Sequence, residues 1–505
     1  MYHKIPRRLF LALVFFALAS RQKIIASEVN FTRCEWCWIG GVTDGEIVIK
    51  AKLSSKIPNE KSKKQHIKLL YSKNPNLDSR DTTKVLAECF NDKIATFKIE
   101  ELEEDSVYYY QIVTYGRKYP KSEKLKFKTV KKYKQYNFSI ACSSCSGGNI
   151  GEFLNNGVSN NKVFDIIAQH SFQDRVNNDK NLSLFIHMGD LHYRNDLPFL
   201  GVEERNIEDY RKNYDLVMQQ ERQRNLYQNL PLAYIWDDHD YGSNDANKDY
   251  GLKNCAALAY REQFPHYDLE DAGAIYQSFI IGRVRFIMTD CRFYREPIEP
   301  KEKRQKYPDC QIDLEQLDNE TSPYKTLLGN KQRKWLLGQL CEAKKQQETN
   351  QEGLTIWVNS VPWIGDQNDP KTESWNQYHD ERATIANFIE KEGINKLLML
   401  SGDAHMLAID DGKAGTTRNC YASEGGGSFP IIQAAALSSR GSVKGGPYNG
   451  EKYIVDKTDS KHKDGAIPGS GQWGLLNFQD YGDKIEVNVE LKRQHITKIA
   501  HKFTF

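Results

Sequence analysis

The chain has 505 residues, of which 39% are hydrophobic and 27% are charged, so it is long enough for two or three domains and has an ordinary globular composition. The 70 Lys and Arg residues against 67 Asp and Glu residues leave a formal net charge of only +3. This small charge gives no argument for a nucleic acid or an anionic membrane as the main partner, and we expect no nucleic-acid-binding module.

Residues 1–26 predict a secretory signal peptide. Lys4, Arg7 and Arg8 precede an apolar run at 9–19, and small residues follow it. An uncut signal anchor is the alternative, but a run of about eleven apolar residues is short for a membrane span. No later stretch reaches about 18 apolar residues, so we expect no transmembrane segment in the mature protein. The protein is therefore expected to be secreted or delivered to the endomembrane lumen, whether extracellular or lysosomal.

Secretion would permit disulfide bonds among the ten cysteines. Two C-x-x-C pairs occur, Cys34/Cys37 and Cys142/Cys145, but they lie more than 100 residues apart, which disfavours one zinc site made of both. The disulfide pairing cannot be deduced from the sequence. Four Asn-x-Ser/Thr sequons fit the same compartment: Asn30, Asn137, Asn181 and Asn319.

Residues 28–130 predict an all-β domain. Short alternating segments such as "GEIVIKAKL", "IKLLYS", "IATFKIEEL" and "SVYYYQIVTY" follow one another without a long helical pattern. About 100 residues of this kind are typical of an immunoglobulin- or fibronectin-like β-sandwich. The Lys-rich stretch at 128–136 is interpreted as a linker.

Residues 137–505 predict an α/β domain. Apolar strand-like runs alternate with helical segments such as "IEDYRKNYDLVMQQERQRNLYQNL" and "GNKQRKWLLGQLCEAKKQ". This alternation favours a sheet with many parallel strands. The predicted strands are "FSIAC", "SLFIHMGD", "LAYIWDDHD", "VRFIMTD", "LTIWVNSVP", "KLLMLSGDAH" and, near the end, "KIEVNVELK".

Five of these runs end in residues that can bind metals. Each residue alone has a simpler explanation, such as a helix cap, a turn former or a buried thiol. Ligands collect at the carboxyl ends of strands in α/β sheets, so five such ends favour one shared site. The candidates are Cys142, Asp190, Tyr193, Asp238, His239, Asn359, Asp403 and His405.

The donor types predict two different cations. Thiolate, phenolate, imidazole and carboxylate together favour a transition metal, and the anionic donors suit ferric iron. Oxygen donors alone favour a hard cation such as calcium or magnesium, and that set is Asp190, Asp238, Asn359 and Asp403. Because Asp190 belongs to both sets, we expect it to bridge a two-metal centre.

These strand-end motifs resemble the PhoD-type alkaline phosphatases of the metallophosphoesterase superfamily. The matching segments are "GDLHY", "WDDHD", "TDCRFYR", "LLGNKQRKWL" and "SGDAH", in the family's order. Two positions depart from the family pattern: Asp240 replaces the usual Glu, and Cys291 the usual Thr. The resemblance implies an α/β metallophosphoesterase domain, a β-sheet sandwich flanked by helices, preceded by the all-β immunoglobulin- or fibronectin-like sandwich domain.

The resemblance also implies a role for each site residue. His239 would act as general acid or hydrogen-bond donor, Arg292 and Arg295 would clamp the phosphate, and a metal-bound hydroxide would be the nucleophile. Calcium (Ca2+) would be held by the oxygen set given above. Iron (Fe3+) would be held by Cys142, Asp190, Tyr193 and His405.

The implied activity is hydrolysis of phosphate monoesters or diesters, with inorganic phosphate as a product. A ferric purple-acid-type phosphatase is an alternative, because that family also joins a β-sandwich to a metallophosphoesterase domain and shares a G-D-x-x-Y motif. Cys142, Asn359 and Asp403 argue against its His-rich pattern. A catalytically silent secreted binding protein is a further alternative, which the complete set of ligand positions disfavours.

Overall fold

The fold is known from a computed structural model. The predicted signal peptide and the sequons at Asn30, Asn181 and Asn319 lie outside the described residues. Within the part of the chain that is described, no helix combines the length and the apolarity that a membrane span requires. The described residues are 34–53, 67–77, 83–87, 89–90, 94–114, 117–119, 124–147, 157–171, 182–194, 204–298, 324–364, 373–412, 427–442, 448, 452–453 and 470–505.

The described N-terminal residues form strands joined by turns, as the alternating pattern predicts. Tyr108, Tyr110 and Ile112 on one strand face inward, while Val107 is exposed. Strands β3, β4, β7 and β8 form a five-stranded sheet with β9, which pairs with β7. The strands are β1 (Cys34–Gly40), β2 (Ile47–Leu53), β3 (Ile67–Ser72), β4 (Thr83–Ala87), β5 (Cys89–Phe90), β6 (Ile94–Ile99), β7 (Val107–Thr114), β8 (Arg117–Tyr119) and β9 (Leu125–Lys128).

A ten-stranded sheet joins the N-terminal region to the rest of the chain. Its order is β22-β21-β20-β10-β11-β12-β1-β2-β6-β5. Gly40 of β1 pairs in parallel with Leu232 of β12. The two predicted domains, residues 28–130 and 137–505, therefore share this sheet through the pairing of β1 with β12. The additional strands are β10 (Phe138–Ser143), β11 (Leu182–Met188), β12 (Leu232–Ile235), β20 (Gln472–Asp480), β21 (Ile485–Arg493) and β22 (Ile496–Thr504).

A seven-stranded sheet packs against the ten-stranded one. Its order is β13-β14-β15-β16-β18-β17-β19, and β14, β15, β16 and β18 are parallel. Both sheets contain the strands that the apolar runs predicted. The strands of the second sheet are β13 (Gln277–Ile281), β14 (Val284–Met288), β15 (Leu354–Asn359), β16 (Leu397–Ser401), β17 (Leu407–Asp410), β18 (Ile431–Ala434) and β19 (Lys452–Tyr453).

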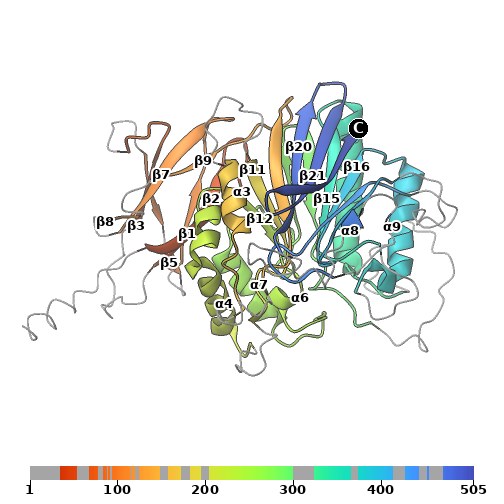
Figure 1. Ribbon diagram of the computed structural model, residues 1–505, viewed down its shortest axis with the longest axis horizontal. Helices are drawn as coiled ribbons and strands as arrows, with labels where there is room; N and C mark the ends of the chain where they lie inside the picture. Colours follow the sequence, from red (N-terminus) through yellow and green to blue (C-terminus); the bar gives the residue numbers. More distant parts are fainter. Residues whose placement is uncertain are drawn as a thin grey trace, which may run out of the picture.

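Helices cover the outer faces of the two sheets. Helices α8 and α9 lie on the seven-stranded sheet, whereas α3, α4 and α5 contact the ten-stranded sheet (Figure 1). The helical pattern predicted from 207 divides at Gln220, whose extended ψ of 120° separates α4 from α5. The helices are α3 (Val163–Ser171), α4 (Ile207–Gln219), α5 (Glu221–Tyr227), α6 (Asp238–Tyr241), α7 (Lys253–Gln263), α8 (Gly329–Glu348), α9 (His379–Glu392) and the 3-10 turn η6 (Trp375–Tyr378).

Aromatic side chains fill the space between the sheets. Phe138 and Phe478 stack with ring centroids 4.5 Å apart, and Phe286 of the opposite sheet meets them edge-on. On the same strand as Phe286, the next residue Ile287 faces the helices. This period of two explains why strands buried on both faces are continuous apolar runs in the sequence.

A buried ion pair also connects the two sheets. Arg283, in the β13–β14 turn, donates from Nε and Nη2 to the two carboxylate oxygens of Asp480, and both side chains are at most 5% exposed. Removing one partner leaves an uncompensated buried charge. We expect Asp480→Asn to lower the free energy of unfolding by about 3 kcal/mol, measured by urea denaturation.

The matched control is the half-exposed pair Arg222–Asp165. Asp165→Asn should cost less than about 1 kcal/mol, since exposed ion pairs contribute little. Equal effects of the two substitutions would mean that the Arg283–Asp480 pair does not hold the sheets together.

Candidate metal centre

The carboxyl ends of strands from both sheets meet at one rim. Gly402, after β16, fits so closely that a Cβ there would lie 2.8 Å from Met188 O and 2.9 Å from both Ser144 Oγ and Ser360 O. These three neighbours stand at the ends of β11, β10 and β15. The backbone of Asp403 continues the contact, because its N–H donates to Ser144 Oγ at 3.1 Å. The predicted convergence of strand ends is therefore present.

One group of donors gathers around Asp190. The ligand atoms of Cys145, Asp190, Asp403 and His405 all lie within 4.8 Å of one another. Tyr193 Oη donates to Asp190 Oδ2 at 2.7 Å and is 3.1 Å from His405 Nε2. The structure thus brings together thiol, phenol, imidazole and carboxyl groups, the mixed set that the sequence predicted for one cation.

The thiol in this group belongs to Cys145, whereas the prediction was Cys142. Cys142 lies inside β10, fully buried, beside Gly474 of the neighbouring strand β20. A Cβ on Gly474 would lie 2.9 Å from Cys142 Sγ, so this sulfur packs against the strand and does not reach the rim. Cys145 Sγ lies 3.6 Å from Asp190 Oδ2. Both are free thiols, so no disulfide joins this C-x-x-C pair.

A second group consists of Asp190, Asp238 and His239, again with ligand atoms within 4.8 Å of one another. Asp238 and His239 open helix α6. Tyr193 links the two groups, because its ring centroid is 4.3 Å from that of His239. Asp190 therefore belongs to both groups, as the bridging prediction requires.

Asn359, a predicted calcium ligand, ends β15, and Asp240, a departure from the family pattern, lies in α6. The side chain of Asn359, at the end of β15, accepts from Cys291 Sγ at 2.7 Å and donates to Val361 O. Asp240 accepts from the backbone N–H of Leu191 at 2.8 Å, so it fixes the loop after β11. The two residues that depart from the family pattern, Cys291 and Asp240, thus both make hydrogen bonds that position the rim.

The four residues of the first group share an unusual backbone conformation. Cys145, Asp190, Asp403 and His405 have φ values of 64°, 55°, 58° and 54°. The left-handed region costs a non-glycine residue on the order of 1 kcal/mol, and such strain concentrates at functional sites. The adjacent Gly189, at φ 94°, has no room for a side chain, because a Cβ would lie 2.4 Å from Asp237 Cβ.

The electrostatics of the rim suit a bound cation. Burial raises the pKa of Asp190 well above its usual value, and the charge of Asp238 is the second-largest cause of this rise. Burial and the charge of Asp190 likewise raise the pKa of the Cys145 thiol and of the Tyr193 hydroxyl. Within the described residues, Asp190 Oδ1 is buried and accepts no hydrogen bond. Such donors lower their free energy by coordinating a cation, so these residues fit a metal.

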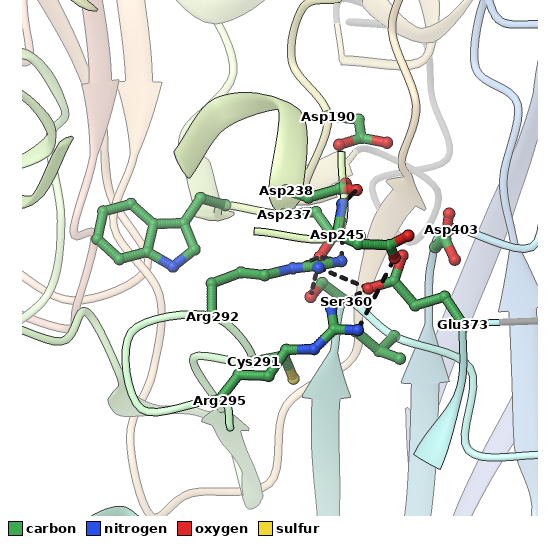
Figure 2. Close-up of polar contacts among 12 residues, drawn as sticks. Asp190, Asp237, Asp238, Asp245, Cys291, Arg292, Arg295, Ser360, Glu373 and Asp403 are labelled. Atoms are coloured by element: carbon green, nitrogen blue, oxygen red, sulfur yellow. Dashed lines mark hydrogen bonds and ion pairs between the residues drawn. The ribbon is translucent and has the colours of Figure 1, made fainter. Parts of the chain in front are cut away.

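The two predicted phosphate-binding arginines are fully buried among carboxylates. Arg292 contacts Asp237 at 2.6 Å through Nε, and its Nη2 lies 3.6 Å from Asp238. Arg295 donates from Nε to Tyr378 Oη at 2.9 Å. Figure 2 shows both guanidinium groups directed at the carboxylate of Glu373, which accepts from Nη1 of each arginine.

Glu373 also belongs to a third acidic group. Its carboxylate, Asp238 and Asp245 have ligand atoms within 4.8 Å of one another. Burial alone would raise the pKa of Glu373, but Arg292 and Arg295 together lower it to about 2. Glu373 is therefore ionised at neutral pH. Burial raises the pKa of Asp245 to about 7, and the charge of Glu373 is the second-largest cause of this rise.

Sequence reasoning missed Cys145 and Glu373. A signal for Cys145 was available: Asp190, Asp237 and Asp403 each stand two residues beyond their strand, and so does Cys145. No comparable signal marked Glu373, which follows no strand and lies 81 residues from Arg292 in the chain.

The chain is similar to known phosphatases in sequence and in fold. The family model of the PhoD-like phosphatases matches residues 165–493. Alkaline phosphatase D of Bacillus subtilis (strain 168) is 25% identical over 253 residues, an alignment that spans 44% of this chain and 41% of that relative. A structure of PhoD shares the fold, with a TM-score of 0.62 and 16% identity over 93% of this chain and 88% of the other.

A purple acid phosphatase from yellow lupin (Lupinus luteus) seeds shares the fold as well. Its TM-score is 0.58, with 12% identity over 94% of this chain and 74% of that chain. The two solved structures therefore support one arrangement of sheets and helices across the chain.

The two cysteines provide a matched pair of substitutions. We expect Cys145→Ala to lower the metal content of the purified protein by at least about half, because it removes a donor at the rim. Cys142→Ala should leave the metal content unchanged, since its sulfur packs inside the sheet. Elemental analysis by mass spectrometry measures both. Metal loss on Cys142→Ala alone would reverse the assignment.

Proposed function

This chain belongs to the PhoD-like phosphatase family, and on that premise we propose that it hydrolyses phosphate esters at the rim where the strands meet. The observation that carries the proposal is the position of Asp190. Its carboxylate is shared by a mixed thiol, phenol and imidazole group and by an acidic group with His239. A shared carboxylate of this kind is the structural requirement for a two-metal phosphoesterase.

We propose iron (Fe3+) and calcium (Ca2+) as the two cations. Softer and anionic donors suit the iron, namely Cys145, Asp190, Tyr193 and His405. Carboxylates suit the calcium, namely Asp190, Asp238 and Asp403, with Asn359 nearby. When bound, such cations lower the pKa of a water molecule and neutralise charge on a transferring phosphoryl group.

The chain's own side chains supply the remaining functions. His239 lies at the rim with 5% of its surface exposed, where a ring nitrogen can donate a proton to the departing ester oxygen. Asp237 orients Arg292, because it accepts from Nε of that arginine and from Ser360 Oγ at 3.0 Å. The burial of these groups excludes bulk water and strengthens their electrostatic interactions with the phosphoryl group.

A purple-acid-type phosphatase remains the second candidate, favoured by the fold shared with the lupin enzyme. The two candidates differ in their donors, because Cys145 and Asp403 supply sulfur and oxygen where the purple acid pattern has histidines. A catalytically silent binding protein would show no turnover of p-nitrophenyl phosphate at any pH. Metal analysis and turnover measured on the same preparation discriminate the three.

Substitution of the shared carboxylate tests the two-metal arrangement. We expect Asp190→Asn to lose both metals and to reduce kcat for p-nitrophenyl phosphate by more than about 1,000-fold, because a neutral amide cannot bridge two cations. Asp165→Asn, on the exposed face of α3, is the control and should retain full activity. Substantial turnover by Asp190→Asn, or two zinc ions in the unchanged protein, would contradict the proposal.

His239 is tested separately from metal binding. We expect His239→Gln to lower kcat by about 100-fold, the usual loss when a general acid is removed. The loss should be smaller for an ester with a more acidic leaving group, such as 2,4-dinitrophenyl phosphate, which needs less protonation. Metal content should remain that of the unchanged protein. A loss of metal in this variant would instead identify His239 as a ligand.

A further inference from the structure

The carboxylate of Glu373 occupies a site built for an oxygen anion. One oxygen, Oε1, accepts from Nη1 of Arg292 at 2.5 Å and also from Nη1 of Arg295. Glu373 is 8% exposed, and the two arginines are at most 1% exposed. Two buried guanidinium groups that converge on one oxygen are the arrangement with which proteins bind phosphate.

Each arginine is held in place without Glu373. Arg292 uses Nε and Nη2 for Asp237, which is itself fixed by Ser360 Oγ. Arg295 uses Nε for Tyr378 Oη, which donates onward to Glu296 O at 2.6 Å. The Nη1 groups would therefore keep their direction if another anion replaced the carboxylate.

The site adjoins the metal centre. Glu373 and Asp238 share the third acidic group, and Asp238 in turn lies with Asp190 and His239 in the second. Figure 2 shows Asp238, Asp245 and Glu373 gathered around the end of the Arg292 side chain. A phosphoryl group bound beside Asp190 and Asp238 would thus direct its outer oxygen toward the position of Glu373 Oε1.

We propose that Glu373 is a specificity-determining residue, whose carboxylate occupies the oxyanion subsite between Arg292 and Arg295 and thereby disfavours phosphate monoesters relative to diesters. This inference rests on the proposed phosphoesterase function. A diester has two non-bridging oxygens and one negative charge, so it does not require the occupied subsite. A monoester has a third non-bridging oxygen and, above pH of about 6, nearly a second charge, which the carboxylate blocks and repels.

The alternative role for Glu373 is that of a cation ligand with Asp238 and Asp245. The two guanidinium groups on its Oε1 argue against this role, because a metal ion there would face two positive charges at close range. Metal content distinguishes the two roles, since only a ligand would lose a metal on substitution.

The test uses the full chain with Glu373→Gln, which removes the charge and keeps the shape. We expect the ratio of kcat/KM for p-nitrophenyl phosphate to that for bis(p-nitrophenyl) phosphate to rise about tenfold, since a neighbouring unit charge changes affinity by at least that factor. The rise should come mainly from a lower KM for the monoester. Calorimetric titration with inorganic phosphate should show binding tighter by a similar factor.

The matched control is Glu352→Gln, a buried glutamate whose two oxygens pair with Arg285 away from the rim. It should lower stability without changing the ester ratio. If Glu373→Gln does not fold, Glu373→Asp withdraws the carboxylate by one methylene and should shift the ratio in the same direction by a smaller factor.

Three results would overturn the inference: an unchanged ester ratio in a folded, fully metallated Glu373 variant, weaker binding of inorganic phosphate, or the loss of a metal. The absence of turnover by the unchanged protein with either ester would instead refute the proposed function.

Discussion

Repulsion among buried carboxylates is the constraint on which this rim depends. Asp190, Asp238 and Asp403 are each at most 3% exposed, and their charges reinforce the effect of burial on the pKa of Asp190. Side chains of this kind would separate if the backbone allowed it. The sheets, whose strands end at the same rim, hold them together, and cations are the groups that relieve the repulsion.

Holding these carboxylates together also requires a strained backbone. The same two-residue unit, glycine followed by aspartate, follows β11 and β16 as Gly189-Asp190 and Gly402-Asp403. In each unit the glycine passes too close to a neighbouring strand end for a Cβ, and the aspartate adopts the left-handed region. Close approach of the strands and the strained aspartate are thus two aspects of one geometry, and the surrounding sheets stabilise both.

Much of the fold could be predicted, because strands buried on both faces leave continuous apolar runs in the sequence. The clustering of donor residues at the rim could also be predicted from those runs, because the carboxyl ends of parallel strands lie at a common edge. The sequence pointed to Cys142 because the apolar run ends there, one residue before the end of β10, whereas the thiol in the donor group, Cys145, stands two residues after the strand. Glu373 could not be found, because its contacts with Arg292 and Arg295 depend on long-range packing that no local pattern records.

The parallel pairing of β1 with β12 has a consequence for the evolution and handling of the molecule. β12 is an interior strand of the ten-stranded sheet, and β1 covers one of its two hydrogen-bonding edges. A chain lacking β1 would present that edge as a template for strand exchange between copies, the usual origin of edge-to-edge aggregation. The N-terminal strands β1, β2, β6 and β5 therefore continue the sheet beyond β12, and they move its described edge to the two-residue strand β5, which is too short to serve as a long template.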